Sequence, residues 1–282
     1  MKNIGIFINP YLKEKTQIFN LLEDLKKNNN INLLKPISQK EVIPDFIPEV
    51  TEKDKIDIIL VFGGDGTILR AVDFAIRSSA PILGINLGNL GFLSESSVSE
   101  FSKSIDAVRN NKFTIQKRML LKIVLKRDKK KVYSGLALND AVIYKGREPK
   151  LIDIKVYSNN RFVLKTRCDG IIAATPTGST AYSLSAGGPI LSQVMDAIVI
   201  SPLNPHILSV RPMVFSASDS IRFVIKNTHK ETVLNHDGQN SFKLKANDEI
   251  FVTAASEKVS FIKLSNRTFF QILRKKLHMG KQ

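Results

Sequence analysis

One stretch decides how this chain folds: Asp57-Ile-Ile-Leu-Val-Phe-Gly63-Gly64-Asp65-Gly66-Thr67-Ile-Leu-Arg70. The apolar residues before Gly63 suit a buried strand. Three glycines then surround one carboxylate, and apolar residues resume at helical spacing from Ile68 through Val72. The pattern predicts a strand, a tight turn and the start of a helix.

The glycines of this turn indicate a phosphate site. They let backbone N–H groups approach a ligand closely, and the start of the following helix carries partial positive charge. Asp65 conflicts with plain phosphate binding. A fixed carboxylate repels phosphate unless it holds a cation or takes a proton from a reacting group. The turn therefore suggests chemistry rather than binding alone.

Strands alternate with helices over residues 1–112. Apolar runs at 4–8, 57–62 and 82–86 predict strands, and helical spacing predicts helices over 18–25 and 68–77. Ser97 and Glu100 form a capping box for another helix. The segment 35–55 holds three prolines and several charges, so we expect it to run over the surface. The alternation predicts a doubly wound parallel sheet, whose ligands bind at the carboxyl ends of strands.

From Phe113 onward the pattern changes to strand after strand. Short apolar or alternating runs predict strands at 119–126, 132–138, 152–157, 162–165, 197–200, 221–225, 242–244, 250–253 and 259–264. Helical spacing returns after Thr268, with Phe270, Leu273 and Leu277 on one side. The fold class is an N-terminal doubly wound α/β domain, 1–112, followed by a C-terminal β-sandwich-like domain, 113–264.

The net charge of +16 raises the question of a polyanionic partner. The other reading is lysines dispersed for solubility. Basic residues cluster only at Lys126–Lys131 and Arg274–Lys276, and neither cluster is interleaved with aromatic residues. We therefore expect no nucleic acid as a partner.

The composition and the N-terminal sequence also indicate where in the cell the protein is expected. No apolar run approaches the about 18 residues that a membrane span needs, and the N-terminus resembles a first strand more than a signal peptide. Cys168 is the single cysteine, so neither an internal disulfide nor a cysteine-rich metal site is expected. We expect a cytoplasmic protein with no membrane partner.

Several standard sites are missing from the sequence. It has no P-loop motif, its Gly64-Asp65-Gly66 lacks the third glycine of a dinucleotide fingerprint, and its histidines do not form a His-Glu-x-x-His motif. His206 stands between prolines, and we interpret it as a loop histidine.

Four small polar clusters remain. They are Asn139-Asp140, Arg167–Gly170, Thr175–Ser183 and His236–Gln239. Taken in isolation, the first and last are better interpreted as ordinary turns, a strand-ending turn at Asn139-Asp140 and a hairpin turn at Asp237-Gly238. The Thr175–Ser183 run, followed by Ser185, holds too many hydrogen-bonding groups to bury without partners. A nucleotide-like ligand would satisfy them.

Taken together and in this order, these motifs resemble the NAD kinases over most of the chain. The resemblance rests on Gly63-Gly64-Asp65-Gly66-Thr67, Asn86-Leu-Gly-Asn-Leu-Gly-Phe-Leu93, Asn139-Asp140, Asp169–Pro189, Pro205-His206, Arg211-Pro212 and Asp237-Gly238-Gln239. The glycine turn alone is shared with lipid kinases such as the diacylglycerol and sphingosine kinases. The Thr-Pro-Thr-Gly-Ser-Thr-Ala-Tyr run is far more specific.

The resemblance implies transfer of a phosphoryl group from ATP, or in some members polyphosphate, to the adenosine ribose 2′-hydroxyl of NAD. Asp65 would be the general base, and Mg²⁺ would arrive with the nucleotide instead of binding in a dedicated protein site. The resemblance also implies that the helix in 265–282 returns to the first domain, and that the protein is a homotetramer.

The same likeness assigns roles to individual residues. Gly63, Gly64 and Gly66 would leave room for phosphates, with Arg70 and Lys150 as further phosphate contacts. Asn139 and Asp140 would hold a ribose and the nicotinamide end, and Asp169 would join that site across a subunit boundary. The pocket would be completed by Thr180, Ala181, Tyr182, Ser183 and Ser185, with Arg167, Asn204 and Gln239 at its margin.

This chain departs from the family pattern at three positions. Asp140 stands where members usually have Glu, Asn89 occupies a position that is often basic, and Asn204 one that is often small. Asp140 shortens the hydrogen-bonding arm by one methylene, which leaves its contact open.

Three other functions are possible on the residues alone. A lipid kinase would need a membrane-facing surface and would lack the Thr175–Ser183 run. A dinucleotide sensor would bind NAD or NADP without consuming ATP. A nucleic-acid-binding protein would bind DNA with steep salt dependence.

Overall fold

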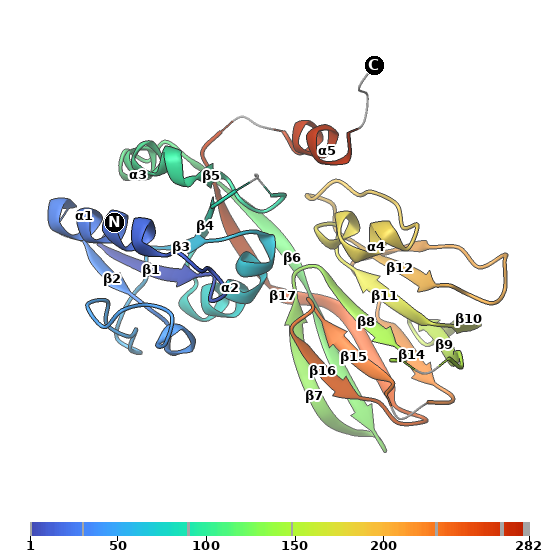
Figure 1. The fold of residues 1–282 in the computed structure, drawn as a ribbon. Helices are drawn as coiled ribbons and strands as arrows, with labels where there is room; N and C mark the ends of the chain where they lie inside the picture. The colour runs from blue at the N-terminus through green and yellow to red at the C-terminus, as the bar shows by residue number, and fades with distance from the viewer. Residues whose placement is uncertain are drawn as a thin grey trace. The chain divides into compact units, whose positions relative to one another are not determined.

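The computed structural model describes residues 2–29, 31–88, 91–147, 149–228, 231–265 and 268–278. Its contacts divide the chain into two compact units, Met1–Lys117 with Val259–Gln282, and Arg118–Lys258. The chain passes between them within two strands, β6 (Thr114–Arg127) and β17 (Glu249–Lys263), both visible in Figure 1. The domain limits given above stay a prediction, because units defined by contacts need not fold independently.

Unit 1 is built on a parallel sheet in the order β2-β1-β3-β4. Its strands are β1 (Asn3–Ile8), β2 (Asn32–Leu34), β3 (Ile58–Phe62) and β4 (Ile82–Asn86), and β5 (Ser96–Ser97) and the end of β17 also pair with β4. The helices are α1 (Thr16–Asn29), α2 (Asp65–Ser78) and α3 (Phe101–Arg109), with 3₁₀ turns η1 (Ile37–Gln39) and η2 (Val98–Glu100).

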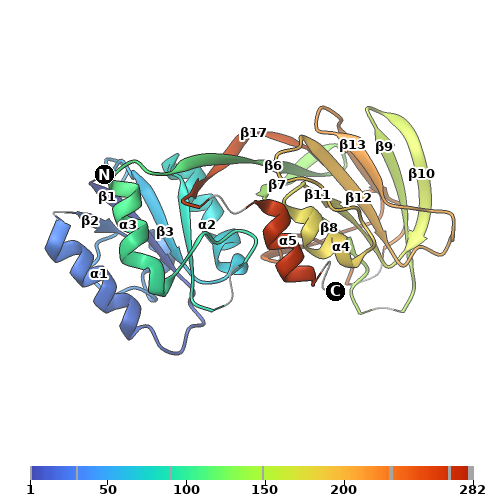
Figure 2. The same cartoon turned by 90° about the horizontal axis from the view of Figure 1, so that it is seen from above.

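Helices cover both faces of this sheet, as a doubly wound fold requires. Figures 1 and 2 show α1 and α3 together on one face and α2 on the other. Alternate residues of β1, among them Ile4 and Ile6, pack with Leu22 of α1 and Ile105 of α3 in one buried core. Alternation in the strands places each apolar side chain under one helix layer or the other.

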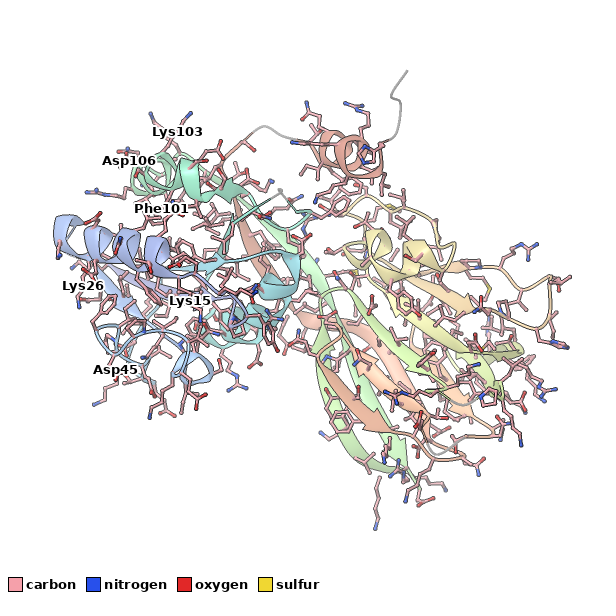
Figure 3. The ribbon with its side chains drawn as sticks, viewed as in Figure 1. Lys15, Lys26, Asp45, Phe101, Lys103 and Asp106 are labelled. Carbon is pink, nitrogen blue, oxygen red and sulfur yellow. The ribbon has the colours of Figure 1, made fainter. Side chains whose placement is uncertain are left out.

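The prediction of a surface path for residues 35–55 is wrong in the middle of that segment. Ile43 and Ile47 are buried in the unit 1 core. Lys35 is only 2% exposed, and its ammonium group donates to the carbonyl oxygens of Ile43 at 2.7 Å and Pro44 at 3.2 Å. Its carboxylate partner Asp45, labelled in Figure 3, is exposed. Prolines and charges correctly indicated an irregular backbone, but the two carbonyl oxygens and the Asp45 carboxylate accept from the Lys35 ammonium group, which allows this lysine to be buried.

Unit 2 is a sandwich of two sheets. The first sheet runs β7-β6-β17-β14-β9-β10 and the second β13-β12-β11-β8-β15-β16. The remaining strands are β7 (Lys130–Ala137), β8 (Asp140–Tyr144), β9 (Ile152–Ser158), β10 (Arg161–Cys168), β11 (Gly170–Ala174), β12 (Ala197–Leu203), β13 (Met213–Ser216), β14 (Ile221–Ile225), β15 (Val233–His236) and β16 (Asn240–Lys243). One core lies between the sheets, with Ile123 and Phe223 from the first and Ile143 and Ile200 from the second. The expected fold class is confirmed.

Short helical segments complete the chain. η3 (Gly178–Thr180) and α4 (Tyr182–Ser185) follow β11, and α5 (Phe269–Leu277) begins after a capping box of Thr268 and Gln271. The predicted capping box of Ser97 and Glu100 is confirmed, and it leads into α3. None of the described helices is both long and apolar enough to cross a membrane.

Candidate active site

The glycine turn joins β3 to α2 in unit 1. Gly63 has φ +154°, and a Cβ there would lie 2.3 Å from the Thr67 Oγ1 atom, so a side chain is excluded on both grounds. Gly64 precedes the first residue of α2, and a Cβ on Gly64 or Gly66 would meet no atom within 4 Å. Both glycines are exposed. The helix start therefore presents bare backbone to open space, the arrangement that suits an anion.

Asp65 is the first residue of α2, and its carboxylate is held by the loop after β4. Its Oδ2 atom accepts from the N–H of Phe92 at 2.9 Å, and Oδ1 accepts from the N–H of Leu93 at 3.1 Å. A Cβ on Gly91 would lie 2.0 Å from Oδ1. An ionised carboxylate accepts about four hydrogen bonds, so two acceptor positions remain for a ligand. The side chain is oriented and still able to accept a proton.

The loop that holds Asp65 is tied to the sheet. Asn86, the last residue of β4, accepts from the Gly88 N–H at 2.6 Å, and the Ser94 hydroxyl accepts from the Gly91 N–H at 2.8 Å. Asn89 and Leu90 lie outside the described residues. These bonds hold the loop that supplies the two N–H groups orienting Asp65.

Arg70, five residues into the same helix, reaches toward β1. Its Nη2 atom lies 3.4 Å from the side-chain oxygens of Asn9 and Thr67, and its guanidinium lies over the ring of Tyr11 at 5.5 Å. The predicted unit 1 residues therefore gather at the carboxyl ends of β1 and β3, as expected for ligand sites in parallel sheets.

In unit 2, one carboxylate organises the start of β8. The Asp237 side chain accepts from the N–H groups of Leu138 at 2.7 Å, Asn139 at 2.8 Å and Asp140 at 3.0 Å. Burial raises the pKa of Asp237, against the lowering effect of the three donors. Asp237 is therefore more than a residue of the hairpin turn, because its carboxylate fixes the backbone of both Asn139 and Asp140.

The Asp140 side chain is buried on the outer face of the second sheet. Asp140 pairs with Ala174 and therefore shares its face, and Ala174 packs with Val142 and Ile172 beneath the segment that follows β11. Burial, and secondarily the negative charge of Asp237, raises the pKa of Asp140 to about 7. Both causes act in the same direction, and no charge-stabilising contact offsets them among the described residues. Asp140 therefore changes charge near neutral pH.

The Thr175–Ser183 run satisfies much of its own hydrogen bonding. The Ser179 hydroxyl donates to the Pro176 carbonyl at 2.7 Å and accepts from the Leu191 N–H at 3.0 Å, and Ser183 shares a 3.0 Å hydrogen bond with Ser201. Both serines are fully buried. The expectation that a ligand must satisfy these groups is wrong for them, because the chain folds back over itself.

Other residues of the run face outward. Tyr182 is 45% exposed, Ser185 is exposed, and Thr180 and Ala181 are half-buried. Burial, and then the nearby acidic groups of Tyr144, Asp140 and Asp169, raises the pKa of Tyr182. The structure therefore brings Tyr182 into the field of two predicted site carboxylates.

Asp169 precedes β11 at the end opposite Asp140. Its carboxylate accepts from the Asn204 amide at 2.9 Å and pairs with the Lys145 ammonium at 2.6 Å. The hydrogen bonds from Asn204 and Lys145 lower the pKa of Asp169. Sequence reasoning missed Lys145, because one lysine among 42 basic residues carries no signal until the ends of β8, β11 and β12 are aligned.

Three predicted residues stand apart from these groups. Arg167 is 59% exposed and pairs with Asp153 at 3.4 Å. Lys150 is exposed between β8 and β9, and Gln239 is exposed in the turn between β15 and β16. The structure assigns them no shared contact with Asp140 or Tyr182.

Two further observations concern possible ligand sites. Within the described ranges, no group of three or more His, Cys, Asp or Glu side chains is arranged to hold a metal ion. A cavity of about 160 Å³ lies between α1 and α3 and is lined by Leu25, Ile105 and the Phe101 and Asp106 labelled in Figure 3. It includes no residue of the glycine turn.

Family models match both halves of the chain. The ATP-NAD kinase N-terminal domain matches residues 4–113, and the ATP-NAD kinase C-terminal domain matches residues 138–264. These matches define the class of the protein, a phosphotransferase that acts on an alcohol group.

Similar sequences and similar solved structures point to the same family as the family models. An NAD kinase of Carboxydothermus hydrogenoformans is 42% identical over 82% of this chain and 83% of its own, and an NAD kinase of Heliobacterium modesticaldum is 34% identical over the whole of both chains. A crystal structure of yeast NADH kinase complexed with NADH has a TM-score of 0.88 at 27% identity, covering 100% of this chain and 89% of its own. An NAD kinase from Archaeoglobus fulgidus in complex with ATP has a TM-score of 0.73 at 25% identity, covering 99% of each chain. The chain belongs to the NAD kinase family.

Proposed function

We propose that this NAD kinase transfers the terminal phosphoryl group of ATP to the 2′-hydroxyl of the adenosine ribose of NAD, with Asp65 as the general base. The observation that carries the proposal is the orientation of Asp65. Its carboxylate is fixed by the N–H groups of Phe92 and Leu93 at the start of a helix whose glycines leave open space. A base must be within hydrogen-bond reach of its proton, and a fixed carboxylate meets this need without rearrangement.

The ribose 2′-oxygen attacks the γ-phosphorus, the bond from that phosphorus to the β,γ-bridging oxygen breaks, and ADP leaves with the electron pair. The hydroxyl proton passes to an Asp65 oxygen. Phosphoryl transfer depends mainly on positioning and on neutralising the charge of the equatorial oxygens. The backbone N–H groups at Gly64 and Gly66 and the positive end of α2 would do part of this.

The donor set at the turn fits Mg²⁺ brought by the nucleotide. Mg²⁺ is commonly held by one or two carboxylates plus substrate phosphates, and the turn offers one carboxylate with free acceptor positions. Asp65 is the residue that would contact the ion, which would neutralise charge on the phosphates.

The dinucleotide would be held by unit 2. Asn139 and Asp140 would bind a ribose and the nicotinamide end, and Tyr182 would cover them. Thr180, Ala181 and Ser185 would line the same pocket, while buried Ser183 would support it from beneath. Asp169, oriented by Lys145 and Asn204, would serve the site of a neighbouring subunit in a homotetramer. Arg167, Asn204 and Gln239 would lie at the margin of the pocket, and Lys150 would be a further phosphate contact.

ATP is the proposed donor because the Archaeoglobus structure is an ATP complex of a protein of the same family. Polyphosphate remains the second candidate, since the open backbone at Gly64 and Gly66 would accept any phosphate chain. We place the reaction in the cytoplasm, where the buried thiol of Cys168 stays reduced.

The test is to incubate the protein with NAD, Mg²⁺ and either ATP or polyphosphate, and to identify the product by phosphorus and proton NMR. The proposal expects a phosphate on the adenosine 2′-oxygen with ATP as donor. Tight NAD binding with no phosphorylated product from either donor would instead indicate a dinucleotide sensor.

A further inference from the structure

The outer face of the first sheet of unit 2 carries a row of side chains from neighbouring strands, which are labelled in Figure 1. Alternate residues of these strands fill the core between the two sheets, so the residues between them lie on the outer face. Tyr157 of β9 lies opposite Phe162 of β10 and Arg222 of β14, and Arg222 lies opposite Phe251 of β17. The ammonium group of Lys126, on β6, lies 4.7 Å from the centre of the Phe251 ring. Strand pairing thus aligns, in this order, Lys126, Phe251, Arg222, Tyr157 and Phe162.

Cations and aromatic rings contact each other along this row. The guanidinium of Arg222 lies 4.3 Å from the centre of the Tyr157 ring. The rings of Tyr157 and Phe162 are 5.7 Å apart at an interplanar angle of 71°. Phe162 is 59% exposed, and the other members of the row are half-buried. The sheet therefore presents aromatic surface to solvent, with neighbouring cations that hold the rings in place.

Two pairs of lysines lie directly opposite each other in the same sheet. Lys155 of β9 pairs with Lys165 of β10, and Lys126 of β6 pairs with Lys131 of β7. Like charges in this arrangement destabilise a sheet. None of the ion pairs formed within the described residues includes any of these four lysines. The Lys155 pair lies beside the two rings, since Lys155 is two residues before Tyr157 on the same strand. Both lysine pairs favour an anionic partner.

The rings restrict the kind of anion. A bare phosphate chain or an acidic peptide would contact the lysines and leave the aromatic faces unused. A single strand of nucleic acid offers phosphates together with unpaired bases, which stack on aromatic and guanidinium faces. A duplex keeps its bases paired inside. Neighbouring strands are about 4.8 Å apart, so Phe251 and Tyr157, with β14 between them, are spaced by about 10 Å, which suits bases splayed out of a stack.

We propose that this face binds single-stranded nucleic acid, with bases on Phe251, Tyr157 and Phe162 and phosphates on Lys126 and the Lys155–Lys165 pair. This binding is separate from the kinase reaction, because none of these residues belongs to the proposed active site. The expectation of no nucleic-acid partner rested on basic clusters that lack aromatic residues along the chain. Strand pairing supplies the aromatic residues from elsewhere in the sequence, as it does when it brings Phe251 beside Lys126.

The test measures the fluorescence anisotropy of a labelled single-stranded RNA of mixed sequence, with the matching single-stranded DNA and duplex RNA as further probes. Phe162→Ala is compared with Phe270→Ala, because both rings are 59% exposed and Phe270 lies in α5, outside this sheet. Phe162→Ala should raise the Kd for the single strand about tenfold, as expected for the loss of one stacked base. Phe270→Ala should leave it unchanged. A single strand of either kind should bind more tightly than the duplex, and the comparison of RNA with DNA shows whether the ribose hydroxyl contributes.

Lys165→Glu separates binding from folding. A glutamate opposite Lys155 forms a favourable cross-strand pair, so the thermal midpoint should equal that of the wild type or exceed it. The affinity for single-stranded RNA should nevertheless fall on the order of tenfold, and the slope of its logarithm against the logarithm of salt concentration should decrease by about one. Lys103→Glu makes the same charge change at an exposed position of α3 and should alter neither quantity.

Equal effects of Phe162→Ala and Phe270→Ala on the Kd would overturn the stacking of bases on this face. Equal affinity for duplex and single strand, or an equal loss in Lys103→Glu and Lys165→Glu, would show attraction by net charge alone and would overturn the proposal. The molar mass of the variants, measured by light scattering, gives a further check. A smaller assembly in Phe162→Ala or Lys165→Glu than in the controls would mean that a second copy of the chain covers this face, which also overturns it.

Discussion

The buried carboxyl of Asp140 makes the stability of the fold depend on pH. Its pKa in the folded protein is raised to about 7 by burial, whereas an unfolded chain has an ordinary aspartate pKa near 4. Below about pH 4 both states hold the proton. Between about pH 4 and 7 only the folded state keeps it, so the contribution of Asp140 to stability falls as pH rises.

The first prediction follows from this sign. Asp140→Asn cannot ionise, so its free energy of unfolding relative to wild type should increase between pH 5 and pH 8, as measured by urea unfolding. Asp169→Asn is the matched control, and its difference from wild type should stay constant between pH 5 and pH 8. The pKa of Asp169 is lowered by Asn204 and Lys145, so its stabilising effect is present above the ordinary aspartate pKa and is lost as pH falls. A pH-independent difference for Asp140→Asn would contradict the buried acid.

Single residues also show where sequence reasoning stops. Asp65 and the glycines around it could be recognised from the sequence, because the strand, the turn and the helix start that define their positions are all local in the chain. Lys145 could not, since its partner Asp169 is 24 residues away and reaches it only through the pairing of β8 with β11. The internal hydrogen bonds of Ser179 and Ser183 have no signal in the sequence for a related reason: their partners Leu191 and Ser201 become neighbours only after the chain has folded.

At the scale of elements, the turn between β3 and α2 contains glycines with two different roles. Gly63 is required by the backbone conformation, whereas Gly66 leaves space for the proposed ligand. The second prediction is that Gly63→Ala destabilises the protein by about 1–3 kcal/mol, because of its positive φ and its contact with Thr67. Gly66→Ala meets no atom and lies in the first turn of α2, so its stability should be equal or up to about 1 kcal/mol higher.

Gly66→Ala should impair activity although it does not reduce stability. Its methyl group would enter the space proposed for the phosphates, so the KM for ATP should rise while the thermal midpoint stays equal or rises slightly. Kinetics and calorimetry on the same preparations check both properties. Normal ATP kinetics in a folded Gly66→Ala enzyme would argue against phosphates at this helix start.

How well a strand could be predicted depends on how its buried residues are arranged in the sequence. β1 and β4 were expected at nearly their observed limits, because short apolar runs with turn residues on both sides are distinctive. β8 and β11 were not expected as strands. All five residues of β11 are buried, so the strand shows none of the polar alternation of a half-exposed strand and adjoins a polar motif instead. The 43–47 segment was missed because isolated isoleucines have no period.

For the whole molecule, the return of the chain through β17 depends on a buried glutamate. Glu95 is 3% exposed and pairs with the Lys263 ammonium. It also accepts from the N–H groups of Leu264 at 3.0 Å and Ser265 at 2.8 Å. This carboxylate fixes the end of β17 beside β5 within unit 1.

The third prediction is that Glu95→Ala destabilises the protein by about 3–5 kcal/mol, because it leaves the half-buried ammonium group of Lys263 and two backbone N–H groups without their acceptor. Urea unfolding measures the loss, and limited proteolysis should cut near residues 264–265 in the variant only. Asp196→Ala is the control, since its ion pair with Lys258 at 3.4 Å is exposed and is expected to contribute at most about 1 kcal/mol. Similar losses in both variants would contradict the anchoring role.

The central claim is that Asp65 takes the proton of the attacking hydroxyl. Asp65→Asn removes the base, but it also disturbs one of the bonds to Phe92 and Leu93, so a second variant is needed to separate the two effects. Ser94→Ala loosens the same loop by removing the acceptor of the Gly91 N–H and leaves the carboxylate in place.

The decisive measurement is the turnover number for NADP formation in Asp65→Asn and Ser94→Ala, with NAD binding measured by calorimetry on the same samples. We predict that Asp65→Asn binds NAD like the wild type and loses turnover by a factor on the order of 10² or more. Ser94→Ala should lose less than about tenfold, because the base remains. Near-normal turnover in Asp65→Asn, or an equal loss in both variants, would contradict the account.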